Sequence, residues 1–360
     1  MDIIPAWDQL ARSALEPNPF YESWALIPAV EQFKTTYPDA FILLVWADTA
    51  HSQLIGLFPL NYERTYHRCP ACYCLNWQHL HAPLGTPLIH KQYVEPAFNA
   101  LFTWLYQETD ATVFSFKNIP LEGEFYRRLA LFTQSKGYCV DAADTWERAF
   151  LHSKLATQQY LLSHHRKKKR KELVRLRRRL MEQGQVSFAS LLPGEMSNID
   201  QWVHDFLQLE QAGWKGLKGT ALASKTHERQ FAEQLIRGAA QNGQLMMLKM
   251  SVNDKPIAMK LNFLAATQGA YALKIAYDEQ YAAYSPGVLM ELENLRLTLD
   301  EGLFDWMDSC AIPNHSMINH LWAERRLMGN IHISTSHLLS KPLIHTMRFI
   351  RNAYRHYKGM

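Results

Sequence analysis

The stretch from Gln244 to Asp308 restricts the fold of this chain more than any other part of its sequence. Three apolar runs separated by turn signals predict strands over Gln244–Ser251, Pro256–Leu264 and Ala270–Tyr277. After a segment of helical periodicity, a further extended pattern follows over Leu303–Asp308. Strands joined to a helix in this way are typical of an α/β domain.

A corner of sequence Tyr-Ser-Pro-Gly separates the third strand from that helix. Pro286 cannot donate a hydrogen bond to a neighbouring strand, and Gly287 permits backbone conformations that other residues avoid. Apolar residues then recur at helical spacing from Val288 to Leu299, and Gly302 ends the helix. We therefore expect the third strand to stop at this corner.

The first turn of a helix has unpaired N–H groups and a partial positive charge, so the corner is a candidate anion site. In this interpretation the amides of Gly287, Val288 and Leu289 bind a pyrophosphate. The alternative is an ordinary turn in which Ser285 caps the helix.

Two successive runs of helices and strands, similar in size, indicate that one α/β unit has been duplicated. A length of 360 residues is sufficient for two domains. The first run ends near Leu151–Thr157. We therefore predict one domain over residues 1–154 and a second over residues 155–360, which ends in a basic amphipathic helix at Lys341–Met360.

Four short motifs occur in order in the second half of the chain. They are Glu210…Gly213-Trp214-Lys215-Gly216…Gly219-Thr220-Ala221, Tyr271…Lys274-Ile275-Ala276-Tyr277-Asp278, Tyr284-Ser285-Pro286-Gly287 and Gly302…Phe304-Asp305. Together they resemble motifs of the GNAT acyltransferases of the CelD-like branch, which is often found beside polysaccharide genes. That branch is related to the FemAB-type peptidoglycan aminoacyltransferases. The resemblance covers residues 155–310 well and the N-terminal half more weakly.

The resemblance implies an α/β fold of tandem GNAT-like domains, each with a mixed central sheet flanked by helices. The N-terminal domain would be a degenerate copy, and the second domain would be the acyltransferase with a donor of acyl-CoA type. Classical GNAT enzymes carry a basic, glycine-rich pyrophosphate loop at the corner, whereas this chain has only Tyr284–Gly287. On the resemblance we expect donor binding at Lys274, Tyr284, Ser285, Gly287 and Val288.

Acyl transfer to an amine needs a neutral amine, a polarised carbonyl and close positioning of the two. In this family a backbone N–H of the splayed strand Ala270–Tyr277 would polarise the carbonyl. Glu210 is a candidate base, with a solvated carboxylate at a helix end as the alternative. Tyr277 is a candidate proton donor to the leaving thiolate, and His315 is a second candidate base. Aromatic packing and a surface loop position are the respective alternatives.

Three further residues are predicted to bind the substrate. Trp214 and Lys215, in a glycine-bounded loop, would cover the acceptor or contact an anionic group, with packing as the alternative for Trp214. Asp305 and Asp308 point to opposite faces of one strand, so one of them is expected to face the cleft. We assign that position to Asp308.

Lys274 interrupts an apolar strand, where a charge is costly unless it is paired or near solvent.

The net charge of +4 comes from a single segment. Residues 166–179 contain ten Lys or Arg and one Glu, a charge of +9, so the rest of the chain carries −5. A helix over Thr157–Gln183 is predicted, with a narrow leucine stripe. The cationic faces are either solvated or bind an anionic partner: CoA phosphates, an acidic acyl carrier protein, tRNA or an anionic membrane surface. The expected contacts are Arg166, Lys167, Lys168, Lys169 and Arg170. Aromatic residues typical of single-strand RNA readers are missing from this run.

Five cysteines, an odd number, suit free thiols in a reducing compartment. Cys69, Cys72 and Cys74 are clustered, with His79 and His81 close by, so a zinc site is one interpretation. No second, well-spaced pair of ligands is evident, so buried thiols on a strand are predicted and no metal. No run approaches the ~18 apolar residues of a membrane span, and no secretory signal is evident. We expect a cytoplasmic protein, or one peripheral to the inner membrane.

These observations predict an enzyme that moves an acyl group from acyl-CoA, or an acyl carrier protein, to an amine. The acceptor would be a sugar, a small amine or a cell-envelope or polysaccharide precursor. One alternative is a FemAB-like transferase that uses aminoacyl-tRNA. Another is a non-catalytic tandem-GNAT binding module. The sequence sets no expectation for acyl length or oligomeric state.

Overall fold

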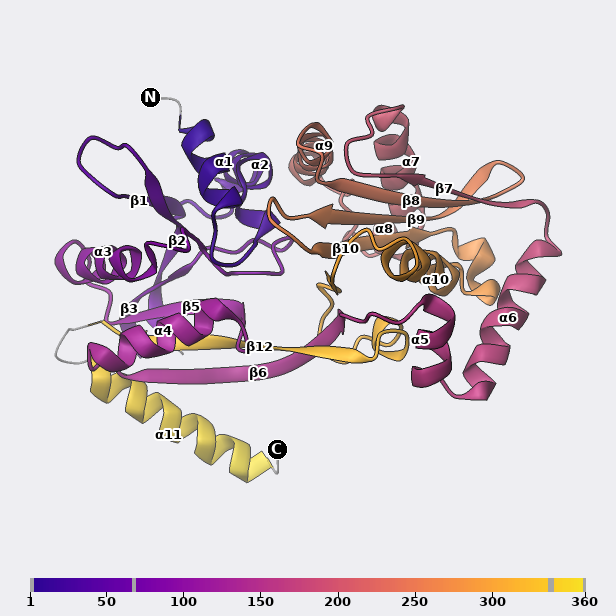
Figure 1. Cartoon of the computed structure of the whole chain (residues 1–360). Helices are drawn as coiled ribbons and strands as arrows, with labels where there is room; N and C mark the ends of the chain where they lie inside the picture. The colour runs from indigo at the N-terminus through magenta and orange to yellow at the C-terminus, as the bar shows by residue number, and fades with distance from the viewer. Residues whose placement is uncertain (1–2, 67–68, 336–339, 359–360) are drawn as a thin grey trace. The chain divides into compact units, whose positions relative to one another are not determined.

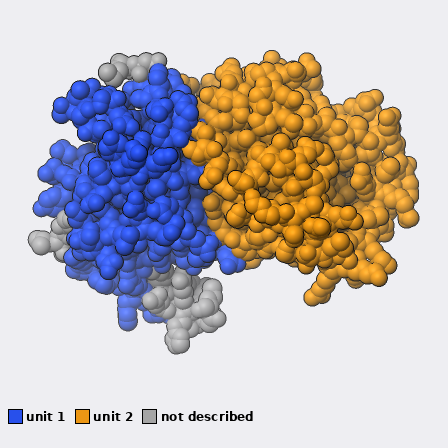
Figure 2. Space-filling model, in the orientation of Figure 1, with its two compact units in different colours: residues 1–23, 33–147, 327–360 blue, residues 24–32, 148–326 orange. Residues whose placement is uncertain are grey.

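The computed structural model describes residues 3–66, 69–335 and 340–358, and these form two compact units (Figure 2). Unit 1 consists of Met1–Ser23, Phe33–Glu147 and Leu327–Met360, and unit 2 of Trp24–Gln32 and Arg148–Arg326.

Unit 1 contains a mixed sheet that includes β1, β2, β3, β5 and β12 in this order (Figure 1). The short strand β4 pairs with β2. The β1–β2, β2–β3 and β5–β12 pairs are antiparallel, whereas β3–β5 is parallel. Its elements are α1 Ile4–Arg12, the 3₁₀ helix η1 Pro19–Tyr21, β1 Phe41–Trp46, β2 Leu54–Tyr66, β3 Cys69–Asn76, β4 Leu88–Ile89, α3 Val94–Gln107, β5 Val113–Pro120, α4 Glu124–Ser135 and α11 Ser340–Lys358.

Unit 2 contains a mixed sheet in the order β7-β8-β9-β10-β11. The first three pairs are antiparallel and β10–β11 is parallel. Its elements are α5 Thr157–His164, α6 Lys167–Met181, β7 Val186–Leu191, α7 Ile199–Ala212, α8 Trp214–Leu217, α9 Thr226–Gln241, β8 Leu245–Val252, β9 Lys255–Leu264, β10 Ala270–Tyr277, the 3₁₀ helix η2 Glu279–Tyr284, α10 Pro286–Leu299, β11 Met307–Asp308 and η3 Ile318–His320.

Three elements have residues in both units. They are α2 Ser23–Phe33, β6 Val140–Leu151 and β12 Glu324–Ser334. The end of β6 pairs antiparallel with β11 inside unit 2, just as β12 pairs antiparallel with β5 inside unit 1.

The two sheets share one pattern, which confirms the tandem α/β fold. In each, three antiparallel strands lead to a helix and a parallel strand: β1-β2-β3, α3 and β5 in unit 1, and β8-β9-β10, α10 and β11 in unit 2. In each, a final antiparallel strand comes from a distant part of the chain. The sheets are therefore two copies of one arrangement.

The units differ from the predicted ranges 1–154 and 155–360 because two segments cross over. Most of α2 belongs to unit 2, where Trp24 donates to Gln244 Oε1 at 3.1 Å and packs edge-on against Phe263. The C-terminal segment belongs to unit 1, where Ile344 and Met347 of α11 pack on Val113. Apolar packing thus assigns both segments to a unit that lies apart from them in sequence.

The single basic helix predicted over Thr157–Gln183 is wrong, because the chain forms two helices, α5 and α6, with extended backbone between them. His165 and Arg166 adopt β-type dihedral angles. The break separates two buried faces: Tyr160 packs in a cluster with Trp322, whereas the leucines of α6 pack with β8 and α10. A single straight helix over this segment would not bury side chains in both clusters.

The structure describes part of the cysteine cluster. Cys72 is half-buried and Cys74 is buried, whereas the side chain of Cys69 lies outside the described residues. Within the described part of the chain, no group of three His, Cys, Asp or Glu side chains is placed to hold a metal ion. Of the helices in that part, none has the length and apolar character needed to cross a membrane.

Candidate functional site

The end of α7 brings an acidic side chain to the face of the unit 2 sheet. Val203, Phe206 and Leu207 are buried on one stripe of this helix, and Glu210 continues the stripe by helical spacing. Its carboxylate is therefore carried into the interior, where the side chain has no exposed surface. Glycine at position 213 ends the helix and starts the turn into α8.

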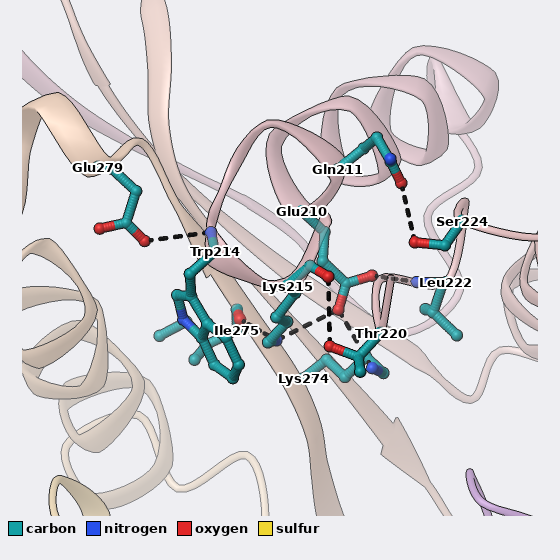
Figure 3. Close-up of polar contacts among 10 residues, drawn as sticks. All are labelled: Glu210, Gln211, Trp214, Lys215, Thr220, Leu222, Ser224, Lys274, Ile275 and Glu279. Carbon is teal, nitrogen blue, oxygen red and sulfur yellow. Dashed lines mark hydrogen bonds and ion pairs between the residues drawn. The ribbon is translucent and has the colours of Figure 1, made fainter. Parts of the chain in front are cut away.

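Two lysines converge on this carboxylate, as Figure 3 shows. Lys274 Nζ from β10 and Lys215 Nζ from α8 lie 3.1 Å and 3.2 Å from Glu210 Oε1. The backbone N–H of Leu222 donates to the other oxygen at 2.8 Å. Both carboxylate oxygens of Glu210 are thus occupied by donors from three separate segments.

The electrostatics of this cluster keep Glu210 ionised. Burial alone would raise the pKa of Glu210, but Lys274, Lys215 and the Leu222 N–H together hold it below its ordinary value. Burial lowers the pKa of Lys215, and Glu210 offsets part of that effect. An anionic Glu210 paired with two lysines is a weak base, so the geometry argues against the general-base role predicted for it. Its contacts fit a positioning role.

Lys215 also reaches the free edge of a strand. Beyond Tyr271, β11 no longer pairs with β10, and the carbonyl of Ile275 on this edge accepts a hydrogen bond from Lys215 Nζ at 2.9 Å. Because the N–H and C=O of one strand residue point to the same edge, the Ile275 N–H lies on that edge too. The splayed strand expected from the sequence is therefore present, with a cationic side chain against it.

Alternation along β10 fixes which helix covers each face. The Lys274 side chain reaches α7, whereas that of the next residue, Ile275, lies beside Gly287 of α10. Helices α7 and α10 therefore cover opposite faces of this strand, and Lys215 approaches the edge between them.

A small cleft lies at this edge. It has a volume of about 20 Å³, enough for one water molecule. Trp214, which is 45% exposed, lines the cleft on its solvent side. Burial raises the pKa of the Tyr277 hydroxyl, and Glu279 adds to the effect, so Tyr277 stays protonated at neutral pH. The lining residues are Leu209, Glu210, Gly213, Trp214, Lys215, Ile275, Ala276, Tyr277 and Glu279.

Glu279 is a residue that the sequence reasoning missed. Its carboxylate accepts a long hydrogen bond from the Trp214 N–H, at 3.5 Å (Figure 3). It is exposed and lines the cleft, so it is the carboxylate there that remains accessible to a ligand. The only signal in the sequence was its place two residues after Tyr277, at the end of a strand.

The structure corrects the anion site predicted at the corner. Two of its three amides, those of Val288 and Leu289, donate to the Ser285 carbonyl at 3.0 Å and 3.2 Å. Gly287 is buried, and a Cβ atom built on it would lie 3.4 Å from Met317 Sδ. The alternative is not found either, because the Ser285 side chain makes no cap hydrogen bond. Tyr284 contacts Arg179, whose guanidinium lies 5.4 Å from the ring centroid.

The cleft-facing position predicted for Asp308 is wrong. Its side chain has no exposed surface and binds Arg148 at 2.7 Å and Arg326 at 2.7 Å. Burial raises the pKa of Asp308, but the two guanidinium groups outweigh this and lower it. Asp308 therefore neutralises buried arginines and does not face a substrate. Its neighbour Asp305 forms an exposed pair with Lys154.

His315 is half-buried and near the charges of Glu291 and Lys215. Its Nδ1 accepts a hydrogen bond from the Met317 N–H at 3.2 Å. The neutral ring therefore carries its proton on Nε2 and presents a donor there. Burial lowers the pKa of His315, which favours this neutral form. The geometry argues against its predicted role as a base.

Residues 167–315 match the model of the family described as the acetyltransferase (GNAT) domain. No curated protein matches the sequence. Among solved structures, FemX is similar over 95% of this chain and 98% of its own, with 10% identity and a TM-score of 0.59.

Two further structures share the fold. One is the C-terminal domain of a protein assigned as a lysylphosphatidylglycerol synthetase in Agrobacterium fabrum: 8% identity, 95% of this chain, 94% of that chain, TM-score 0.54. The other is L-PGS from Bacillus licheniformis, with 11% identity, 93% and 98% coverage and a TM-score of 0.51. Residues 167–315 therefore form a GNAT domain of the N-acyltransferase class, in a chain with the tandem fold that FemX shares.

Proposed function

We propose that the protein transfers an acyl group from an activated donor to an amine, and that the reacting carbonyl lies against the open edge of β10. The donor is acyl-CoA or an acyl carrier protein. The acceptor is the amine of a sugar, a small molecule or a cell-envelope precursor. The reaction forms a C–N bond and breaks the bond between the acyl carbon and the donor's leaving group.

One observation carries this proposal. Lys215 Nζ has three N–H bonds, and its partners among the described residues are Glu210 Oε1 and Ile275 O. One N–H bond is thus left for a ligand in the cleft that Lys215 lines. Together with the Ile275 N–H on the same edge, it supplies two donors where negative charge develops on the acyl oxygen.

Four side chains take different roles in this proposal. Glu210 positions Lys215 and is not itself the base. Tyr277, protonated because of its raised pKa, donates a proton to the leaving group. Glu279, the accessible carboxylate, takes the proton of the attacking amine, directly or through one water. Trp214, on the solvent side of the cleft, covers the acceptor.

The cleft has room for about one oxygen-sized group of the donor and not for a whole donor. At about 20 Å³ it is far smaller than the pockets that bury small-molecule ligands. The rest of the donor therefore lies outside it, and the cleft geometry is compatible with several leaving groups.

A second candidate donor is aminoacyl-tRNA. Two observations favour it: the fold is shared with FemX and with proteins named for lysylphosphatidylglycerol synthesis, and α6 is strongly cationic. The chemistry at β10 is the same, with a tRNA ribose oxygen in place of a thiol as the leaving group.

The test is a transfer assay in which the donor is varied. Purified protein is incubated with acetyl-CoA, acyl carrier protein thioesters or aminoacyl-tRNA and a panel of amines, and amide products are measured by mass spectrometry. We expect one donor class to give product. In Lys215→Met the turnover should fall about 10²–10³-fold, as for loss of one oxyanion donor. Product formation by no donor would contradict the proposal and favour a non-catalytic binding module.

A pair of glutamine variants tests whether the Glu279 carboxylate is the base. Glu279→Gln removes the proposed base and leaves the buried cluster intact, so turnover should fall with little change in the melting temperature. Glu195→Gln, at an exposed residue outside the cleft, is the control for a lost surface carboxylate. Equal rates for Glu279→Gln and Glu195→Gln would remove Glu279 from the mechanism.

A further inference from the structure

Helix α6 presents two opposite stripes. Leu173, Leu176 and Leu180 are buried, and they attach the helix to the core of unit 2. The opposite stripe is exposed and consists of Lys167, Lys171, Val174, Arg178 and Met181. These residues are three or four positions apart, so they lie on one face of the helix. This outward stripe mixes cations with apolar side chains.

The apolar members of this stripe are conspicuously accessible to solvent. Val174 is 70% exposed and Met181 is 59% exposed. Leu162 on α5, which contacts α6, is 53% exposed. Exposed aliphatic side chains surrounded by Lys and Arg are typical of helices that lie in a membrane interface, where the cations remain at headgroup level.

Most of the cations on α6 have no acidic partner among the described residues. Of the ten cations in residues 166–179, the described part of the chain supplies an acidic partner for Arg175 and for Arg178 alone, at 2.7 Å and 3.8 Å. The first turn of α6 contains three lysines and no acidic residue. Cations there oppose the helix dipole, so the arrangement is unfavourable unless an external anion compensates it.

A cationic cavity continues this surface at the start of α6. It has a volume of about 570 Å³ and is lined by groups that donate hydrogen bonds to phosphate, among them His164, Arg166, Lys169, His320 and Arg325. A second hollow of about 420 Å³ lies along Lys167, Lys168 and Lys171. The α5–α6 surface therefore offers room for phosphate groups beside its exposed apolar side chains.

We infer that the outward face of α5 and α6 binds an anionic lipid surface, with Val174 and Met181 entering the headgroup boundary and the lysines contacting lipid phosphates. RNA would match the charge equally well. It offers no place for aliphatic side chains, however, and the outward stripe has no aromatic residue for stacking bases. The inference does not depend on the proposed acyl transfer. It would place the protein at a membrane surface.

The test is cosedimentation of the full chain with lipid vesicles. Vesicles of phosphatidylcholine alone are compared with vesicles that contain about one third phosphatidylglycerol, at low and high salt. We expect binding only to the anionic vesicles, and weaker binding at high salt. Lys167→Gln with Lys171→Gln should weaken binding about 30-fold, which corresponds to about 1 kcal/mol for each lost cation.

A second double variant tests insertion separately from charge. Val174→Ser with Met181→Ser keeps the charge and should weaken binding about tenfold by removing apolar contacts. The controls are Leu131→Ser, at an exposed leucine of α4, and Lys34→Gln with Lys91→Gln, at exposed lysines of unit 1. All the positions changed are on the surface, and melting curves check that each variant is folded.

Three outcomes would overturn the inference. The first is no binding to anionic vesicles. The second is an undiminished affinity of the Val174→Ser and Met181→Ser double variant, because the surface would then sense charge alone. The third is tight binding of a single-stranded RNA oligonucleotide without vesicle binding, which would assign the face to nucleic acid.

Discussion

Replacement of Glu210 by glutamine tests whether the buried cluster is an ion-pair network that holds Lys215 in place. The substitution keeps the shape of the side chain and removes its charge. Two ammonium groups that lay 3.1 Å and 3.2 Å from one oxygen would then face each other without an anion between them. The cost follows from their limited contact with water.

The magnitude can be worked from the burial of the three groups. The side chains of Glu210, Lys215 and Lys274 are 0%, 21% and 16% exposed. Removal of one partner from a buried pair costs about 3–5 kcal/mol. Because both lysines keep some contact with water, we expect the lower end, about 3 kcal/mol. For a unit of this size, that lowers the melting temperature by about 6–12 °C.

The assay is thermal unfolding followed by calorimetry, with a matched glutamate as control. Glu233 also pairs with two cations, Arg229 at 3.0 Å and Arg237 at 3.5 Å, but on the surface of α9. Glu233→Gln should therefore cost less than about 1 kcal/mol. Addition of Lys274→Met to Glu210→Gln should restore part of the loss by removing one uncompensated cation.

Equal melting temperatures for Glu210→Gln and Glu233→Gln would refute this reasoning. A failure of Lys274→Met to restore any stability would also refute it, because the cost would then come from something other than repulsion between the lysines.

Three other changes follow from the same structure. The pKa of Glu210 is lowered in the folded state, so its contribution to stability is present above its pKa in the unfolded chain and is lost as pH falls through its pKa in the folded protein. The difference in unfolding free energy between wild type and Glu210→Gln should therefore shrink in acid. A difference that grows in acid would contradict the assignment. Asp308→Asn should cost about 3–5 kcal/mol in denaturant unfolding, since it removes the carboxylate charge that pairs with the buried Arg148 at 2.7 Å. A loss under about 1 kcal/mol would show that the pair is dispensable. Gly287→Ala should be neutral or stabilising by up to about 1 kcal/mol, because alanine favours a helix more than glycine does and the added Cβ meets its nearest neighbour, Met317 Sδ, at an ordinary contact distance of 3.4 Å. A large loss of donor affinity in this variant would restore the corner as an anion site.

Local patterns predicted much of the fold. The strands expected over Pro256–Leu264 and Ala270–Tyr277 and the helix from Val288 to Leu299 are confirmed as β9, β10 and α10, because each has a clear apolar period and a distinct end. Strand β12 was not predicted, since Arg325 and Arg326 interrupt its alternation. Its pairing with β5 joins residues about 200 positions apart, which local periodicity does not reveal.

The sequence identified several residues of the candidate site but not the contacts between them. Sequence motifs singled out Glu210, Lys215 and Lys274, and the structure brings all three together. Their pairing, which favours a positioning role for Glu210 over the predicted role as a base, depends on the packing of α7 against β10. Asp308 was misassigned for the same reason, because its partner Arg148 is 160 residues away in sequence.

The most direct test of the account is the environment of the donor's carbonyl when it is bound. The donor identified by the transfer assay, labelled with ¹³C at the acyl carbon, is bound to the protein without acceptor and observed by NMR. If Lys215 and the edge of β10 polarise the carbonyl, its resonance moves downfield in wild type and returns toward the free position in Lys215→Met. The same resonance in both proteins would contradict the placement of the acyl group at this edge.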